Sequence, residues 1–458
     1  MVHTFKMFDK YIALDVNSGC VHDMDKLSYD IINFLNVKNF APTSSEAKFK
    51  LIDDLKYDYD RGEISDALAD IAELYENGML WAKDDFEIAS NLKENAPVKA
   101  MCLHVSHDCN LRCKYCFADE GKYHTEKREL MTAETGKRAM DYLVEHSGHR
   151  RNLEVDFFGG EPLMNFEVVK EVVEYARELE KKHNKVFRFT VTTNGILLDE
   201  KKLEYINENM SNIVLSIDGR KEVNDRMRYR ADGSGSYDKI VPIFQKVAES
   251  RNQDNYYVRG TFTRENLDFS KDVIHLADLG FKQISIEPVV CGEETDYSLR
   301  EEDLPKIFNE YESLVKEYVK RIKEGNGFNF FHFMIDLEEG PCIIKRLSGC
   351  GCGCEYLAVA PNGDVYPCHQ FVGSEEYKMG SLYDSNGLNK ELRSTFEKCN
   401  VYTKPDCDSC FAKFFCSGGC IANACLINDD MNKPHKLSCE MMKKRVECSL
   451  YAKAALAD

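Results

Sequence analysis

The chain has 458 residues, of which 43% are hydrophobic and 30% charged, a composition typical of a globular protein with roughly two to four domains. A formal net charge of −18 disfavours a nucleic-acid partner, because like charges repel and no stripe of Lys and Arg stands out. The sequence has no apolar run of about 18 residues and no secretory signal, so we expect a cytoplasmic protein without a membrane segment.

The N-terminal residues 1–95 are expected to form a small module of their own. Turn residues at Asn17-Ser18-Gly19 separate two strand-like stretches, and two segments with helical spacing follow. The expected strands are residues 5–16 and 19–24, and the expected helices are residues 27–37 and 63–80. This order predicts a winged-helix-like unit that either binds a partner or packs as an appendage.

Residues 96–299 alternate apolar, strand-like runs with helical segments. Such repetition, with right-handed crossovers, predicts a parallel sheet. The expected strands are residues 102–106, 153–158, 187–192, 213–217, 256–262 and 284–290. Six units are too few to close an eight-unit barrel, so we expect an α/β fold built on a partial (β/α)6 TIM barrel.

The unusual residues of this region stand at or just past the carboxyl ends of the expected strands, where barrel active sites are built. In chain order they are a triple-cysteine loop, Gly159-Gly160-Glu161-Pro162, Thr192-Thr193-Asn194-Gly195, Ser216 with Asp218 and Gly219, Arg259, and Glu287-Pro288. Structural glycines scattered through a chain would not coincide with strand ends so regularly.

The chain contains 19 cysteines, which fall mainly into an early and a late group. Disulfides are rare in the cytosol, so clustered thiols there usually indicate metal ligands. Cys109, Cys113 and Cys116 have the spacing C-x3-C-x2-C, which fits three corners of a [4Fe–4S] cluster and leaves one iron open. A zinc knuckle that uses His104 or His107 is the alternative.

This cysteine motif, followed by GGEP, TTNG and SIDG, resembles the radical S-adenosylmethionine (SAM) enzymes over about residues 98–295. The resemblance implies that the open iron chelates SAM, which is cleaved to a 5′-deoxyadenosyl radical. The implied SAM-binding residues are Gly160 and Glu161 at the amino group, Tyr115 at the adenine, Ser216 and Asp218 at the ribose, and Arg228 at the carboxylate. The alternatives are a strand-ending turn for Ser216 and Asp218, and a solvated surface arginine for Arg228.

After an expected helical bridge at residues 300–345, residues 346–458 form a cysteine-rich tail. The Asn362-Gly363 pair predicts a tight hairpin that brings the cysteines at 350–354 near Cys368. Eight or so thiolates in two interleaved sets are enough for two more [4Fe–4S] clusters, with two zinc sites as the alternative.

The tail resembles the SPASM extension of radical enzymes that modify peptides. This resemblance implies an outer cluster on Cys407, Cys410, Cys416 and Cys439, and an inner cluster on Cys368 and Cys420 with Cys350 and Cys354. Cys352 and Cys342 remain open as alternative inner ligands. An inner cluster with only three protein ligands would have a vacant iron for a substrate thiolate.

Over all its parts the chain resembles the maturases of six-cysteines-in-forty-five-residues peptides, which form thioether cross-links. That resemblance implies a ribosomally synthesised, Cys-rich precursor peptide whose leader docks on residues 1–95, and an electron donor of the flavodoxin or ferredoxin type. The alternatives are a sulfatase maturase that makes formylglycine, and a non-catalytic electron-transfer protein with three clusters.

Overall fold

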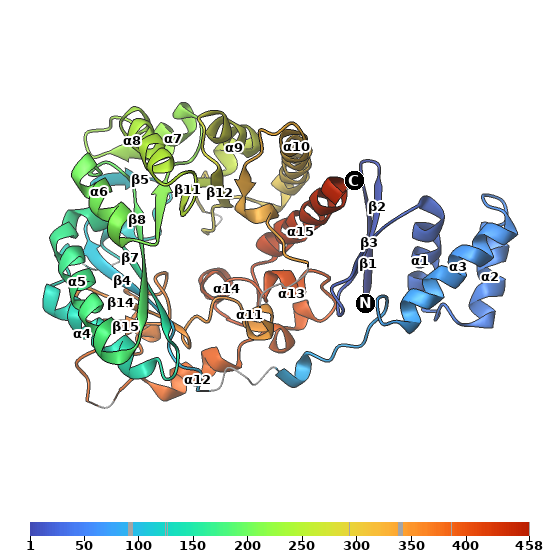
Figure 1. Cartoon of the computed structure of the whole chain (residues 1–458), viewed down its shortest axis with the longest axis horizontal. Helices are drawn as coiled ribbons and strands as arrows, with labels where there is room; N and C mark the ends of the chain where they lie inside the picture. The colour runs from blue at the N-terminus through green and yellow to red at the C-terminus, as the bar shows by residue number, and fades with distance from the viewer. Residues whose placement is uncertain are drawn as a thin grey trace.

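The computed structural model describes residues 1–89, 95–123, 125, 127–292, 294–337, 342–385 and 387–457, so part of the expected bridge, residues 338–341, lies outside it. A small unit of sheet and helices (blue) stands beside a larger body built around a parallel sheet (Figure 1). The last helix, α15 (Lys436–Ala457), runs between the two. Within these ranges no helix has both the length and the apolar character that a bilayer span requires.

Three antiparallel strands and three helices form the N-terminal module around an apolar core of its own. Asp25, Ser44 and Asp60 cap the helices, each accepting a hydrogen bond from a backbone N–H of the first turn. The strands are β1 (Val2–Met7), β2 (Lys10–Asp15) and β3 (Val21–Met24), and the helices are α1 (Lys26–Lys38), α2 (Ser45–Leu55) and α3 (Arg61–Glu76).

Two features of this module differ from the prediction. The expected single strand at residues 5–16 is broken by a turn at Phe8, whose φ of 52° lies in the left-handed region and ends the ladder. Helix α2 was not expected, because only Ala47 and Leu51 of its residues are buried and its apolar stripe is correspondingly narrow.

The six expected barrel strands are all present and parallel, in the spatial order β12-β11-β9-β8-β7-β4, so the prediction of an open α/β sheet is confirmed. Their bounds are β4 (Ala100–His107), β7 (Asn152–Gly159), β8 (Val186–Thr193), β9 (Asn212–Ser216), β11 (Tyr256–Phe262) and β12 (Gln283–Pro288).

Amphipathic helices cover the outer face of this sheet. Strand residues such as Leu103, Phe157 and Phe189 are fully buried in the same core as the apolar sides of these helices. Alternate residues, such as Ser216 and Arg259, face the interior of the barrel. The helices are α4 (Ala133–His146), α5 (Phe166–His183), α6 (Glu200–Asn209), α7 (Lys221–Met227), α8 (Tyr237–Ser250), α9 (Phe269–Asp278) and α10 (Leu304–Lys323).

The parallel sheet is longer than the six expected strands. β13 (Asn329–Phe330) pairs with β12, and β14 (Tyr356–Val359) pairs with β4, each in parallel. The stretch 300–345 is therefore not purely helical: α10 is followed by a sheet strand. Both added strands are short, with little periodicity for a sequence to show.

The C-terminal part is built from a hairpin, short helices and α15. The expected hairpin is confirmed, since Ala358 pairs with Tyr366 and Gly363 supplies the left-handed turn residue (φ 88°). The elements are α11 (Ile343–Ser348), β15 (Asp364–Tyr366), β16 (Gly380–Ser381), α12 (Lys390–Lys398), α13 (Lys413–Cys416) and α14 (Ile421–Asn428).

The N-terminal module contacts the cysteine-rich part directly. The His3 ring on β1 stacks on the Phe411 ring at a centroid distance of 3.5 Å. Asp84 accepts hydrogen bonds from the Tyr402 hydroxyl (2.7 Å) and the Lys413 ammonium (2.9 Å). Burial alone would raise the pKa of Asp84, but these two hydrogen bonds outweigh it and hold the pKa below its ordinary value.

Replacing Asp84 by Ala should lower the free energy of unfolding by about 3 kcal/mol, because it leaves the Lys413 ammonium buried without a carboxylate. Urea unfolding followed by circular dichroism would measure the loss, and the double variant D84A/K413M should recover much of it. The matched control is Asp53→Ala on exposed α2, which should change stability by less than about 0.5 kcal/mol. Equal stability of D84A and the unchanged protein would contradict the ion pair's role.

Candidate active site

One cavity of about 580 Å³ lies at the carboxyl ends of the barrel strands and is closed on its other side by the C-terminal part. Its barrel wall includes the cysteine loop and the ends of β7, β8, β9, β11 and β12. Its opposite wall includes Cys416, Cys420 and Cys439 together with Arg445 of α15. The strand-end residues singled out in the sequence therefore line one cavity together with the late cysteines.

The three cysteines of the early loop all line this cavity. A short strand in the loop, β5 (Leu111–Cys113), pairs with β10 (Arg228–Arg230), which fixes the loop against the barrel mouth. The Asn194 side-chain amide donates to the Cys109 sulfur at 3.6 Å. Burial raises the pKa of Cys109 to about 12 and that of Cys113 to about 11, so a metal must displace protons to bind these sulfurs.

The end of β7 touches the cysteine loop so closely that only glycine fits. A Cβ on Gly159 would lie 2.2 Å from the Ser106 carbonyl oxygen, and one on Gly160 would lie 2.2 Å from the Asp108 carbonyl oxygen. The Gly160 and Glu161 backbone N–H groups donate to the same two oxygens, at 2.8 and 2.9 Å. The GGEP segment thus holds the loop through backbone contacts.

The Glu161 carboxylate is fully buried and joins the end of β7 to the end of β8. It accepts hydrogen bonds from the Thr193 hydroxyl (2.8 Å) and from the backbone N–H groups of Asn194 (2.8 Å) and Leu163 (2.9 Å). Burial raises its pKa against the opposing effect of these donors. Gly160 lines the cavity, whereas Glu161 lies behind its wall.

Tyr115, Asp218 and Arg228 form one hydrogen-bonded chain at the mouth of the barrel. The Tyr115 hydroxyl donates to the Asp218 carboxylate, whose two oxygens both lie at 2.8 Å, and accepts from Arg228 Nη1 at 2.8 Å. Tyr115, Arg228 and Ser216 line the cavity, and Asp218 is fully buried behind them. The Nε of Arg228 is buried and lacks a hydrogen-bond partner, so this wall has an unused donor.

The late cysteines form two separate groups. Burial and the proximity of Cys416, Cys407 and Cys410 raise the pKa of Cys439 to about 12, so these four thiols lie together as expected for the outer set. In the second group, Cys352 donates a hydrogen bond to Cys368, and this bond lowers the pKa of Cys368.

Cys350 and Cys420 complete the second group, since both act electrostatically on Cys352. The Gly353 N–H bonds the Pro367 carbonyl at 3.0 Å and holds the cysteine–glycine run beside Cys368. Of the expected inner ligands, Cys350, Cys368 and Cys420 are thus brought together. Cys352, Cys354 and Cys368 are all buried in the same apolar cluster, where Cys352 donates its hydrogen bond to Cys368.

Several cavity residues carry no sequence motif. His332 and Arg445 come from the segment before the tail and from the last helix, and His369 simply follows Cys368. Asn194 stood within the TTNG motif, but nothing in the motif indicated its bond to a cysteine sulfur. His104 and His107, considered as zinc ligands, bond one another at 3.3 Å in the barrel interior.

The cysteine groups fit iron–sulfur clusters in their donor chemistry. Within the described ranges, no three His, Cys, Asp or Glu side chains converge on one ion-sized point. A cubane cluster needs no such convergence, because each of its irons takes one thiolate. Cys109, Cys113 and Cys116 line one cavity wall together with Arg228, and these three thiols would hold three irons of a cubane cluster.

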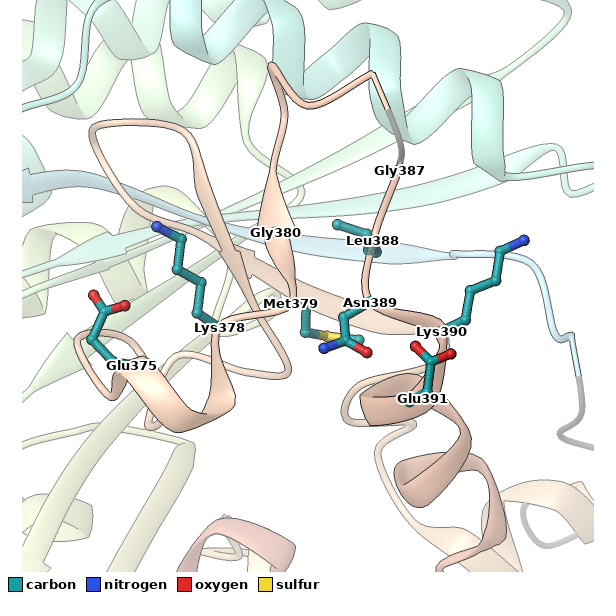
Figure 2. Close-up of a pocket in the computed structure, with 9 residues that line it drawn as sticks. All are labelled: Glu375, Lys378, Met379, Gly380, Gly387, Leu388, Asn389, Lys390 and Glu391. Carbon is teal, nitrogen blue, oxygen red and sulfur yellow. The ribbon is translucent and has the colours of Figure 1, made fainter.

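A second hollow, of about 540 Å³, lies at the β16 edge of the sheet. Glu375 and Lys378 stand on one side of it and Lys390 and Glu391 on the other (Figure 2). Lys378 is already paired with Asp364 at 2.8 Å, and the described lining contains neither cysteine nor histidine. The candidate active site is therefore the larger cavity.

Known proteins resemble this chain in sequence. Residues 103–274 match the model of the radical SAM superfamily. The radical SAM cyclopropyl synthase TigE of Paramaledivibacter caminithermalis is 22% identical, over 92% of this chain and 88% of its own length. A cysteine-type anaerobic sulfatase-maturating enzyme of Clostridium perfringens (strain 13 / Type A) is 27% identical, over 71% of this chain and 89% of its own length.

Solved structures resemble the chain in fold. anSMEcpe with bound AdoMet aligns over 79% of this chain and 100% of its own, with 21% identity and a TM-score of 0.65. Streptococcus suis SuiB bound to the precursor peptide SuiA aligns over 96% of this chain and 100% of its own, with 16% identity and a TM-score of 0.52. At these identities the likeness concerns the fold alone, an α/β radical SAM fold.

Replacing Tyr115 by Phe should weaken SAM binding about tenfold, because it removes the hydroxyl that orients the buried Arg228 against Asp218. Calorimetric titration of the iron-loaded protein would measure the dissociation constant. The neighbouring variant Tyr229→Phe is the control and should bind SAM normally. A Y115F protein with unchanged affinity, or one that has lost its iron, would contradict this role.

Burial raises the pKa of Asp218 to about 6 from its ordinary 3.8. Between about pH 4 and 6, Asp218 therefore keeps its proton in the folded chain and loses it in the unfolded chain. Its contribution to the free energy of unfolding falls by roughly 2 kcal/mol as the pH rises through this range. In urea unfolding across this range, the free energy of D218N minus that of the unchanged protein should rise with pH. A constant difference, like that expected for exposed Asp53→Asn, would refute the raised pKa.

Proposed function

We propose that this radical SAM enzyme, whose residues 103–274 carry the radical SAM domain, joins cysteine sulfur to carbon in a ribosomally synthesised, Cys-rich peptide. The observation that carries the proposal is the cavity in which the early cysteine loop faces Cys416, Cys420 and Cys439. Thioether formation needs a carbon radical close to a thiol, and this cavity would bring the site that makes the radical close to a site that can bind a thiolate.

In this proposal Cys109, Cys113 and Cys116 hold the first [4Fe–4S] cluster. That cluster would supply the electron that cleaves SAM to the 5′-deoxyadenosyl radical. Gly160 offers backbone groups to the amino end of SAM and Arg228 offers its guanidinium to the carboxylate. Glu161 and Asp218 act from behind the wall, holding strand ends and Tyr115 in place.

The cysteine-rich part is proposed to be a SPASM domain with two auxiliary clusters. Cys407, Cys410, Cys416 and Cys439 would hold the outer one. Cys350, Cys368 and Cys420 would hold the inner one, with Cys352 or Cys354 as a further ligand. The domain division accordingly runs 1–95, 96–299, 300–345 and 346–458.

The proposed reaction balances as the loss of two hydrogen atoms. The 5′-deoxyadenosyl radical takes one hydrogen atom from a carbon of the peptide, by the family resemblance a threonine carbon. A peptide thiol would give up its proton, its sulfur would bond to that carbon, and the remaining electron would leave through the auxiliary sites. A donor protein of the flavodoxin or ferredoxin type would supply the electron that starts the reaction. A thiolate at the inner set would lie across the cavity from the SAM site.

The N-terminal module is proposed to bind the leader of the peptide. In its sheet, whose order is β1-β2-β3, helix α15 packs on β1 and β2, and β3 is the edge strand on the other side. An extended leader can add to such an edge through backbone hydrogen bonds. The structure of SuiB, which aligns with 96% of this chain, was solved with the precursor peptide SuiA bound.

A second candidate is the oxidation of a protein cysteine to formylglycine. The likeness to the sulfatase-maturating enzyme of Clostridium perfringens supports it, since that protein is 27% identical. The alignment spans 71% of this chain, whereas TigE and SuiB span more than nine-tenths of it. The thioether assignment is favoured because it accounts for the N-terminal module, which would bind the leader of the peptide.

Mass spectrometry of a leader-bearing, Cys-rich peptide after anaerobic reaction with SAM and reductant would test the proposal. Each thioether should remove two hydrogen atoms and keep the sulfur, whereas formylglycine formation should remove the sulfur. A C109A/C113A/C116A variant should give neither product. SAM consumption without any mass change in the peptide would reject cross-linking by this enzyme.

A further inference from the structure

Four ionisable side chains line the part of the cavity next to β11 and β12. They are Arg259, Glu287, His332 and Arg445, and together they are called the charged wall. They come from β11, from the end of β12, from the turn after β13 and from α15. Arg445 donates to His332 Nδ1 at 2.7 Å and lies 3.4 Å from a Glu287 oxygen. His332 Nε2 lies 3.6 Å from the other Glu287 oxygen.

The charged wall has one positive charge in excess. Burial, together with Arg445 and Arg259, lowers the pKa of His332 to about 3, so this ring is neutral near pH 7. Burial alone would raise the pKa of Glu287, but its cationic neighbours outweigh it and lower it to about 2, so Glu287 is ionised. Two guanidinium groups therefore face one carboxylate.

Both guanidinium groups have unused donors. Among the described residues, none lies within ion-pair or hydrogen-bond distance of the Arg259 guanidinium, which opens into the cavity. Arg445 is only 7% exposed, and its buried Nε has no partner. The Arg259 guanidinium, open to the cavity, favours a ligand that is anionic and accepts hydrogen bonds, and Arg445 adds a second positive charge on the same wall.

The position of Arg259 indicates which ligand this is. On the sheet, Arg259 stands level with Ser216 of β9 on one side and Ser285 of β12 on the other. It also acts electrostatically on His369, the residue after Cys368. The free guanidinium thus lies between the proposed SAM site and the inner cysteine set, where the peptide would be modified.

We propose that Arg259 and Arg445 form a carboxylate-binding subsite for the peptide substrate, next to the residue that is cross-linked. The inference rests on the proposed function in taking the occupant to be a peptide. A planar guanidinium fork matches a carboxylate with two parallel hydrogen bonds, and one carboxylate neutralises the excess charge. The carboxylate belongs either to an Asp or Glu side chain or to a peptide C-terminus.

Binding of three short peptides to the iron-loaded protein with SAM would test the subsite: acetyl-Cys-Glu-amide, acetyl-Cys-Gln-amide and acetyl-Cys-Gln with a free C-terminus. Calorimetry should show the Glu peptide binding about tenfold more tightly than the Gln amide, as one charge-assisted hydrogen bond predicts. If acetyl-Cys-Gln with a free C-terminus also binds about tenfold more tightly than the Gln amide, the subsite accepts a C-terminal carboxylate as well as a side-chain carboxylate. In both cases the subsite stands.

The preference should fall to less than about twofold in Arg259→Gln and survive partly in Arg259→Lys, which keeps the charge without the fork. SAM affinity should be unchanged in both variants. Arg259 opens into the cavity, so its replacement disturbs little packing. The control Arg226→Gln removes an exposed guanidinium that pairs with Glu265, and it should keep the full preference.

Two results would overturn the subsite. The first is that the Glu and Gln peptides bind the unchanged protein equally, or that neither binds. The second is that Arg259→Gln loses affinity for SAM. The second result would show that Arg259 holds the SAM carboxylate instead. Because these measurements require no turnover, they are separate from the product test above. A carboxylate preference without thioether formation would reject the proposed reaction and keep the subsite.

Discussion

The site depends on how closely the end of β7 approaches the loop that carries Cys109. Gly159 and Gly160 have no side chain, and their backbone lies directly against the carbonyls of Ser106 and Asp108. Any larger residue would push the loop away by more than a bond length. Because the loop is also paired with β10, the barrel mouth and the cysteines move as one body, and the cavity keeps its shape.

Two carboxylates support this arrangement without facing the cavity. Glu161 uses both oxygens to join two strand ends, and Asp218 uses its own to orient the Tyr115 hydroxyl beneath Arg228. Motif residues that look like direct ligands in a sequence can therefore act one layer deeper. The groups that line the cavity here are Gly160, Ser216, Tyr115 and Arg228.

Much of this arrangement is predictable from sequence, because regular strand–helix alternation and strand-end motifs are local patterns. The six barrel strands and the hairpin at Gly363 follow from such patterns. The turn at Phe8 and the short strands β13 and β14 do not, since their pairing depends on distant partners. The contact between Cys352 and Cys368 is equally hidden, because the alternating thiols at 350, 352 and 354 look alike in the sequence. The charged wall unites four separate segments, so no spacing rule could reveal it.

Helix α15 has a consequence for how the cavity forms. This final helix contributes Cys439 and Arg445 to the cavity and also packs against the N-terminal sheet. Because α15 lies far along the chain from the barrel strands, the opposite wall of the cavity forms only once this helix has packed in place. Any group of thiols that includes Cys439 is incomplete before then, and the early cysteine loop has no opposite wall.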